Sequence, residues 1–129
     1  MIIYNKHKTV VDYMNNMHFP EVITKLPKAD IPVPGVKGWV AQGENFQIVF
    51  FEIDPTGGIP PHSHSTQFGM VLEGEMSLTI DGKKKRYSKG ETYFIPEGKI
   101  HQAEFHTRVL ALDFFDDPKR YRIKKDTVV

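Results

Sequence analysis

Short runs of β-branched and aromatic residues, separated by Gly, Pro and Asp, fill the chain from Trp39 onward. The runs recur about every 8–12 residues, a spacing typical of all-β sandwiches and barrels. Asp81-Gly82, between two of the runs, is a strong signal for a two-residue β-hairpin. The sequence therefore predicts an all-β fold, with strands at residues 46–53, 68–72, 76–80, 93–95 and 109–115.

Two of these segments, residues 68–72 and 109–115, are apolar on both faces. A half-solvated strand would instead alternate apolar and polar side chains. A further layer must therefore cover their outer face. We expect this layer to be either the N-terminal arm or the partner subunit of a homodimer.

Residues 1–37 differ from the rest, because Pro20, Pro27, Pro32 and Pro34 are expected to forbid regular structure there. Thr9 is a candidate N-cap for a short helix that precedes these prolines. A disordered tail is the alternative to an arm that docks through its apolar side chains, and we expect docking. The predicted organisation is an arm over residues 1–37, a barrel over 38–117 and a C-terminal tail over 118–129.

Composition excludes several classes of protein. The absence of cysteine excludes disulfides, thiolate catalysis and Cys-ligated zinc or iron–sulfur sites. A net charge of +1 gives no electrostatic reason to expect nucleic acid, and the basic residues 83–86 are expected at a solvated hairpin tip. No apolar run approaches the roughly 20 residues of a membrane span. We expect a cytoplasmic protein that binds a small molecule, with neither nucleic acid nor membrane as partner.

The histidines point to a metal. His62 and His64 are spaced i and i+2, which on a strand places both imidazoles on one face. Gln67 follows closely, and His101 comes after a further strand and a Pro-x-Gly turn. Three imidazoles and one carboxamide oxygen converging inside a barrel would suit a first-row divalent metal.

Two segments carry the same residues in a more specific order. Residues 57–74 read GGIPPHSHSTQFGMVLEG, and residues 90–105 read GETYFIPEGKIHQAEF. They resemble the two signature motifs of the cupin superfamily, with Gln67 in place of the usual Glu and Phe105 in place of the usual Asn. The resemblance implies a double-stranded β-helix, the cupin jelly-roll barrel. It also implies a metal held by His62, His64, Gln67 and His101, although some cupins bind none.

The substitution of Gln for Glu has a chemical consequence. Neutral Gln and His ligands leave a divalent ion its full charge, which favours Lewis acidity and an anionic substrate. Gln cannot accept a proton, so acid–base chemistry needs another residue. Asp113 shares one side of the last predicted strand with Val109, Ala111 and Phe115. It is the candidate if this side faces the barrel interior, because burial would raise the pKa of its carboxyl group. A solvent-exposed Asp113 at the edge of the sheet is the alternative.

The end of the chain also resembles the cupins that act on unsaturated uronates from pectin or alginate breakdown. Asp113 and Phe115 match that group, and Arg120 or Lys119 could supply its basic residue. The resemblance implies that Asp113 is catalytic and that Phe115, Arg120 and Lys119 bind substrate. An ordinary charged tail is the alternative reading for Arg120.

We therefore expect a metal-binding, single-domain cupin enzyme that opens or isomerises a small carboxylate-bearing molecule such as an unsaturated uronate. One alternative is an Fe(II)-dependent dioxygenase, because three-histidine sites with open positions can bind oxygen and substrate together. A second alternative is a metabolite-binding cupin without catalysis. The expected cofactor is one divalent transition metal, with zinc, nickel, manganese and iron all open.

Overall fold

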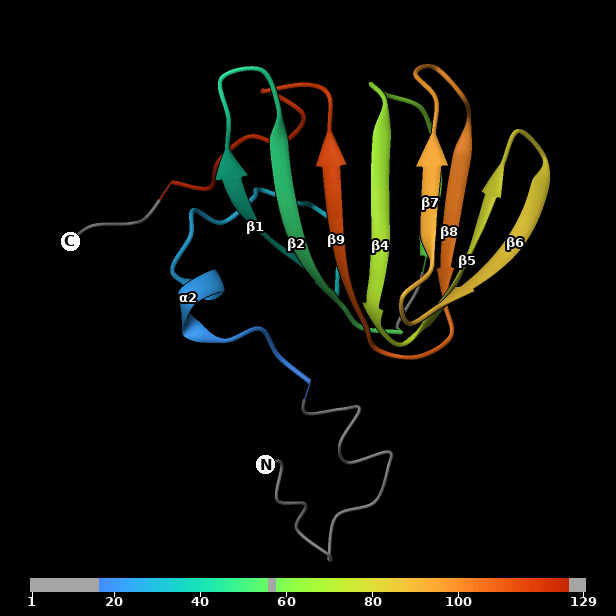
Figure 1. Cartoon of the computed structure of the whole chain (residues 1–129), viewed down its shortest axis with the longest axis horizontal. Helices are drawn as coiled ribbons and strands as arrows, with labels where there is room; N and C mark the ends of the chain where they lie inside the picture. Colours follow the sequence, from blue (N-terminus) through green and yellow to red (C-terminus); the bar gives the residue numbers. More distant parts are fainter. Residues whose placement is uncertain (1–16, 56–57, 126–129) are drawn as a thin grey trace, which may run out of the picture.

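A computed structural model, which describes residues 17–55 and 58–125, shows two antiparallel sheets around a common interior (Figure 1). The five-stranded sheet has the order β1-β2-β9-β4-β7, and the four-stranded sheet has the order β3-β8-β5-β6. This is the predicted all-β jelly roll. Its described elements are α2 (Glu21–Thr24), β1 (Val36–Gln42), β2 (Gln47–Ile53), β3 (Gly58–His62), β4 (Gln67–Glu73), β5 (Glu75–Ile80), β6 (Lys83–Ser88), β7 (Thr92–Ile95), β8 (His101–Phe105) and β9 (Val109–Phe115).

The predicted strands correspond to β2, β4, β5, β7 and β9. The predicted hairpin joins β5 to β6, and both of its turn residues adopt the positive φ of a type I′ turn, 53° at Asp81 and 82° at Gly82. The prediction for residues 83–86 was wrong, since they form strand β6 at the edge of the four-stranded sheet and not the tip of a hairpin. Exposed lysines on an edge strand oppose pairing with a further chain.

Alternation along the strands decides which side chains face the interior. On β9, one set, Val109, Ala111, Asp113 and Phe115, lies on one side of the strand and is buried throughout, and Leu110 on the other side is buried as well. The three apolar residues of this set pack in one apolar core with residues from the four-stranded sheet, such as Met76 and Leu78 of β5. Asp113 therefore lies inside the barrel, because it is on the same side of β9 as these apolar residues.

The outer face of the five-stranded sheet is covered only in part. Phe19, in the segment before β1, contacts the rings of Trp39 and Phe50 edge-on, with centroids 6.2 Å and 5.6 Å apart. Further along the sheet, Phe68 and Phe114 remain 49% and 39% exposed. The arm alone therefore does not supply the predicted covering layer within the part of the chain that is described.

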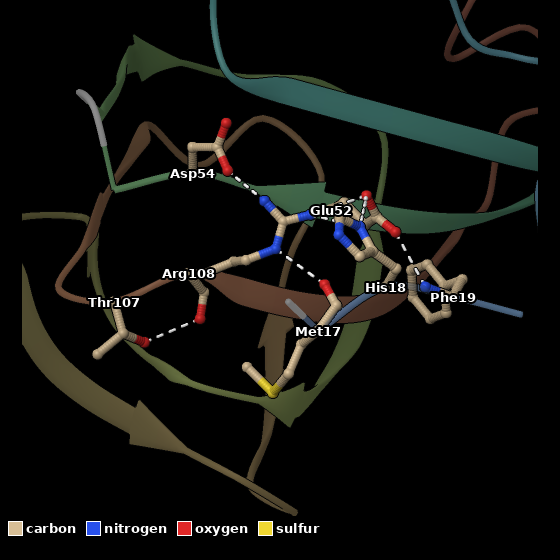
Figure 2. A network of polar contacts seen from close by, with 7 residues as sticks. All are labelled: Met17, His18, Phe19, Glu52, Asp54, Thr107 and Arg108. Atoms are coloured by element: carbon tan, nitrogen blue, oxygen red, sulfur yellow. Dashed lines mark hydrogen bonds and ion pairs between the residues drawn. The ribbon is translucent and has the colours of Figure 1, made fainter. Parts of the chain in front are cut away.

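A polar network fastens this arm to the barrel (Figure 2). Arg108 donates to Asp54, to the backbone oxygen of Met17 at 2.8 Å and to Glu52 at 2.9 Å. Glu52 also accepts the backbone N–H of Phe19 at 2.9 Å. Two strand termini and the arm are thereby joined at one end of β9.

The expectation that the prolines forbid regular structure was wrong at one point. Helix α2 is a single turn that begins directly after Pro20, which occupies the N-cap position. Proline is compatible with a helix start, because the first N–H groups of a helix have no partner within the helix. The short helix predicted after Thr9 lies outside the described residues.

The segment after β9 returns to the barrel. The side chain of Gln47, which is only 1% exposed, accepts from Tyr121 N at 2.9 Å and donates to Tyr121 O at 3.0 Å. This pair of hydrogen bonds holds Tyr121 against β2, and both Arg120 and Tyr121 line the interior cavity. Among the described residues, no helix has the length and apolarity needed to cross a bilayer.

Candidate metal centre

Three predicted histidines come together at one end of the barrel. His62 ends β3 and His101 begins β8, and the two are cross-strand partners. His64 lies beyond the end of β3, so the expectation that both residues of the His-x-His motif share one strand was wrong. The loop nevertheless brings it to the others, and one ring nitrogen from each histidine lies within 4.8 Å of the other two.

The backbone around each histidine determines which ring nitrogen carries the proton. The Nδ1 atoms of His62, His64 and His101 lie 2.9, 2.7 and 2.9 Å from the backbone oxygens of Pro60, Ser65 and Lys99. A carbonyl oxygen can only accept, so each Nδ1 carries the proton and each Nε2 keeps a lone pair. This second contact of a histidine is the one that orients metal-binding imidazoles.

The facing nitrogens then need a cation between them. His64 Nε2 and His101 Nε2 lie 3.0 Å apart. With both protons on Nδ1, two lone pairs would face each other, which is unfavourable without a positive charge. The donor set therefore fits a divalent metal, and imidazole nitrogen suits zinc, copper, iron and nickel.

Burial keeps two of these ligands neutral. It lowers the pKa of His64 from 6.5 to about 4 and outweighs the opposing hydrogen bond to Ser65. Burial is also the largest cause of the lowered pKa of His101. Metal binding requires the unprotonated imidazole, so both ligands are ready at neutral pH.

Gln67 and Asp113 meet beside the histidines. Both line the same cavity as the three imidazoles, and Gln67 Nε2 donates to Asp113 Oδ1 at 2.7 Å. The Tyr93 hydroxyl donates to the same oxygen at 2.8 Å. Burial raises the pKa of Asp113 to about 7, although the two hydrogen bonds lower it. Asp113 is thus inside the barrel, not in solvent at the edge of the sheet.

Arg120 reaches the cavity from the segment after β9. Its guanidinium lies 4.3 Å from the ring centroid of Tyr121 and 5.4 Å from that of Phe115. Its Nε is buried and has no hydrogen-bond partner among the described residues. Lys119 is exposed and does not line the described cavity, so of the two basic candidates only Arg120 contributes to it.

Sequence reasoning missed Tyr93 and Tyr121 in this cavity. Tyr93 sits in a predicted strand, but its partner Asp113 is assigned only once the register across β7, β4 and β9 is known. Tyr121 lies in the expected tail, where no pattern marks it. The cavity is lined by Phe51, Ile53, Ile59, His62, His64, Gln67, Met76, Leu78, Tyr93, Ile95, His101, Ala103, Phe105, Ala111, Asp113, Phe115, Arg120 and Tyr121.

A family model described as "Cupin domain" matches residues 49–115, which is more than half of the chain. The chain belongs to the cupin family. This cupin resembles the solved structure of KdgF from Halomonas sp., with 26% identity and a TM-score of 0.64 over 75% of this chain and 90% of that one. It also resembles an RmlC-like cupin from Shewanella frigidimarina, with 26% identity and a TM-score of 0.67 over 81% and 92% of the two chains.

The curated relatives are longer proteins. Oxalate oxidase 1 from Hordeum vulgare is 40% identical in an alignment of 57 residues that covers 36% of this cupin and 28% of that protein. The matched segment spans about a quarter of the length of the curated relatives. This match is therefore limited to a part of each chain.

Proposed function

We propose that this cupin is a metal-dependent enzyme that acts on a small carboxylate-bearing molecule, in its sharpest form an unsaturated uronate that it opens or isomerises. The observation that carries the proposal is the convergence of three imidazoles, Asp113 and Arg120 on one cavity. The resemblance of Asp113 and Phe115 to the uronate-acting cupins supports the choice of substrate, as does the similarity to KdgF over most of both chains.

His62, His64, His101 and the Oε1 atom of Gln67 would hold the metal. When bound, a divalent ion would supply a Lewis acid that retains its full positive charge, because all four ligands are neutral. The metal would be zinc, nickel, manganese or iron. The charge of the metal would thus favour an anionic substrate in this cavity, in addition to any contribution from Arg120.

Arg120 would bind the substrate carboxylate. A guanidinium that is stacked on two aromatic rings is held in a fixed plane, and its buried Nε has no described partner to compete with a ligand. Phe115 would form the apolar wall on which both the guanidinium and the substrate ring lie. Lys119 would lie too far into solvent to share this role.

Asp113 would transfer the proton. A carboxyl group whose pKa lies at about 7 is present in both protonation states near neutral pH, which suits general acid–base catalysis. Converting the cyclic unsaturated sugar acid to its linear keto form moves protons and breaks the ring C–O bond, with no net gain or loss of electrons. The reaction therefore requires no oxidant.

Metal analysis and one assay test this proposal. We expect about one divalent ion per purified chain, and loss of the double-bond absorbance when an unsaturated uronate is added without oxygen. His62→Ala and His101→Ala should each empty the site, whereas His106→Ala should not, because His106 is exposed and contacts Ser77 instead. Full metal occupancy in both His62→Ala and His101→Ala would refute the proposed set of metal ligands.

An Fe(II)-dependent dioxygenase is the second candidate, favoured by the three-imidazole site and by the local match to a protein named oxalate oxidase. Turnover that requires oxygen would establish it. A metal-loaded protein that binds sugar acids without converting them would instead be a metabolite-binding cupin. The cytoplasmic location expected from the sequence stays a prediction.

We also propose that the protein is a homodimer that pairs through the outer face of the five-stranded sheet. Phe68, Phe94 and Phe114 are cross-strand neighbours there, and all three are exposed. An apolar patch of this kind is typical of a protein–protein interface. Sedimentation should show a dimer at micromolar concentration and a monomer for Phe94→Glu, and a monomeric wild-type chain would contradict the proposal.

A further inference from the structure

The hydrogen bonds around Asp113 connect the proposed metal ligand Gln67 to Tyr93, a residue without an assigned role. Gln67 Nε2 and the Tyr93 hydroxyl both donate to Asp113 Oδ1, at 2.7 Å and 2.8 Å. In this arrangement the amide of Gln67 turns its NH₂ group toward Asp113. Its Oε1 is then left for a different partner.

Gly69 makes the contact between Tyr93 and Asp113 possible. The two residues lie on β7 and β9, with β4 between them, and Gly69 of β4 is the cross-strand partner of both. A Cβ atom at Gly69 would lie 2.2 Å from Asp113 Oδ1 and 2.4 Å from the Tyr93 ring. The side chains of the two flanking strands therefore meet over the glycine, where any larger residue would displace them.

We infer that Tyr93 is a positioning residue of the metal centre which, through Asp113, fixes the Gln67 amide with Oε1 toward the metal. A flipped amide would offer N–H groups, which cannot ligate a cation. Tyr93 restrains Asp113 Oδ1, and Asp113 restrains the amide. The inference rests on the proposed metal site. It extends that site to Tyr93, which acts on the ligand Gln67 through Asp113.

Titrating the metal-free protein with Co²⁺ alone tests the inference without any substrate. Residues that orient metal ligands typically change metal affinity by about 10–100-fold when they are replaced. We expect Tyr93→Phe to weaken Co²⁺ binding by about 10-fold and Asp113→Ala by about 100-fold. The visible Co²⁺ spectrum should change in both variants, because the oxygen ligand is no longer held in place.

Two controls separate positioning from other roles. Tyr87→Phe removes the hydroxyl of a buried tyrosine whose ring centroid lies 5.5 Å from that of Tyr93, and Tyr87 has no hydrogen bond to Asp113 among the described contacts. It should bind Co²⁺ as the wild type does. Asp113→Asn keeps an oxygen for both donors, so it should bind more tightly than Asp113→Ala. A purely electrostatic role of Asp113 would weaken both variants equally.

The outcomes distinguish this inference from the proposed metal site. If Tyr93→Phe, which leaves the carboxylate and the fold's apolar contacts in place, binds Co²⁺ with wild-type affinity and spectrum, Tyr93 does not position the ligand and the metal site stands. If the wild-type chain binds no Co²⁺, both the site and the inference are refuted. Thermal unfolding of the metal-free variants checks that each one is folded.

Discussion

Arg108 and Arg120 flank opposite ends of β9; the side chain of Arg108 is 10% exposed, and the Nε atom of Arg120 is buried. Arg108 is surrounded by acceptors, namely Glu52, Asp54 and the backbone oxygen of Met17 (Figure 2). Arg120 is surrounded by aromatic rings, and its buried Nε has no described partner. An arginine thus has several acceptors at one end of the strand, whereas the Nε atom of the other arginine has none among the described residues.

The difference indicates what each end is for. A buried charge with a full set of partners joins segments that are distant in the sequence, as Arg108 joins the arm to β2. A buried polar group without a partner costs free energy, which a bound ligand can recover. Asp113, at the same end as Arg120, does have two hydrogen-bond donors, but both are neutral, and burial raises the pKa of its carboxyl group.

The largest expected effect is on kcat, at the end of β9 that carries Asp113 and precedes Arg120. Asp113→Asn should lower kcat by about 10²–10⁴-fold, because proton transfer by a positioned side chain contributes about that much. The variant keeps an acceptor oxygen for Gln67 and Tyr93, so its fold should be retained. The measurement is kcat on an unsaturated uronate with the metal at saturating concentration. An unchanged kcat would remove Asp113 from the chemistry and leave it as a structural residue.

The two ends also differ in how far the sequence predicts them. The order of His62, His64, Gly90 and His101 along the chain predicted the site and its fold, because motif spacing is a local property. The contacts of Arg108 depend on which loops meet at the end of β9, and no pattern marks them. Similarly, Tyr93 and Asp113 are 20 residues apart and meet only through the strand order β7-β4-β9.

Replacing each arginine with methionine should give opposite results. Arg108→Met leaves the buried carboxylate of Glu52 without its cation, which costs about 3–5 kcal/mol of unfolding free energy. Arg120→Met should cost much less, because the wild-type Nε already lacks a described partner. Its effect should appear as a KM raised by about 10–100-fold, the loss of one hydrogen bond to a charged substrate group.

Urea denaturation and initial rates, measured on both variants below their melting temperatures, check this pair. Arg108→Met should keep the wild-type KM, and Arg120→Met should keep most of the wild-type stability. If Arg120→Met proves the less stable variant and its KM is unchanged, the contrast between a structural end and a binding end is wrong.

The smallest expected effect is the pH dependence of stability in the metal-free protein. Asp113 has a folded-state pKa of about 7, raised by burial from 3.8. Its contribution to stability is therefore fully present below about pH 4 and is lost as the pH rises through about 7. His64 acts in the opposite direction, since its pKa is lowered to about 4 and its contribution is lost as the pH falls from 6.5 toward that value.

Asp113→Asn removes the first contribution only, so the variant should gain stability relative to the wild type between pH 4 and pH 8. We expect a gain on the order of 1 kcal/mol, because water in the cavity can solvate the ionised carboxylate in part. Urea denaturation of both proteins in the presence of a chelator measures it, and a constant difference across this pH range would mean that Asp113 is ionised as easily as a carboxyl group in water.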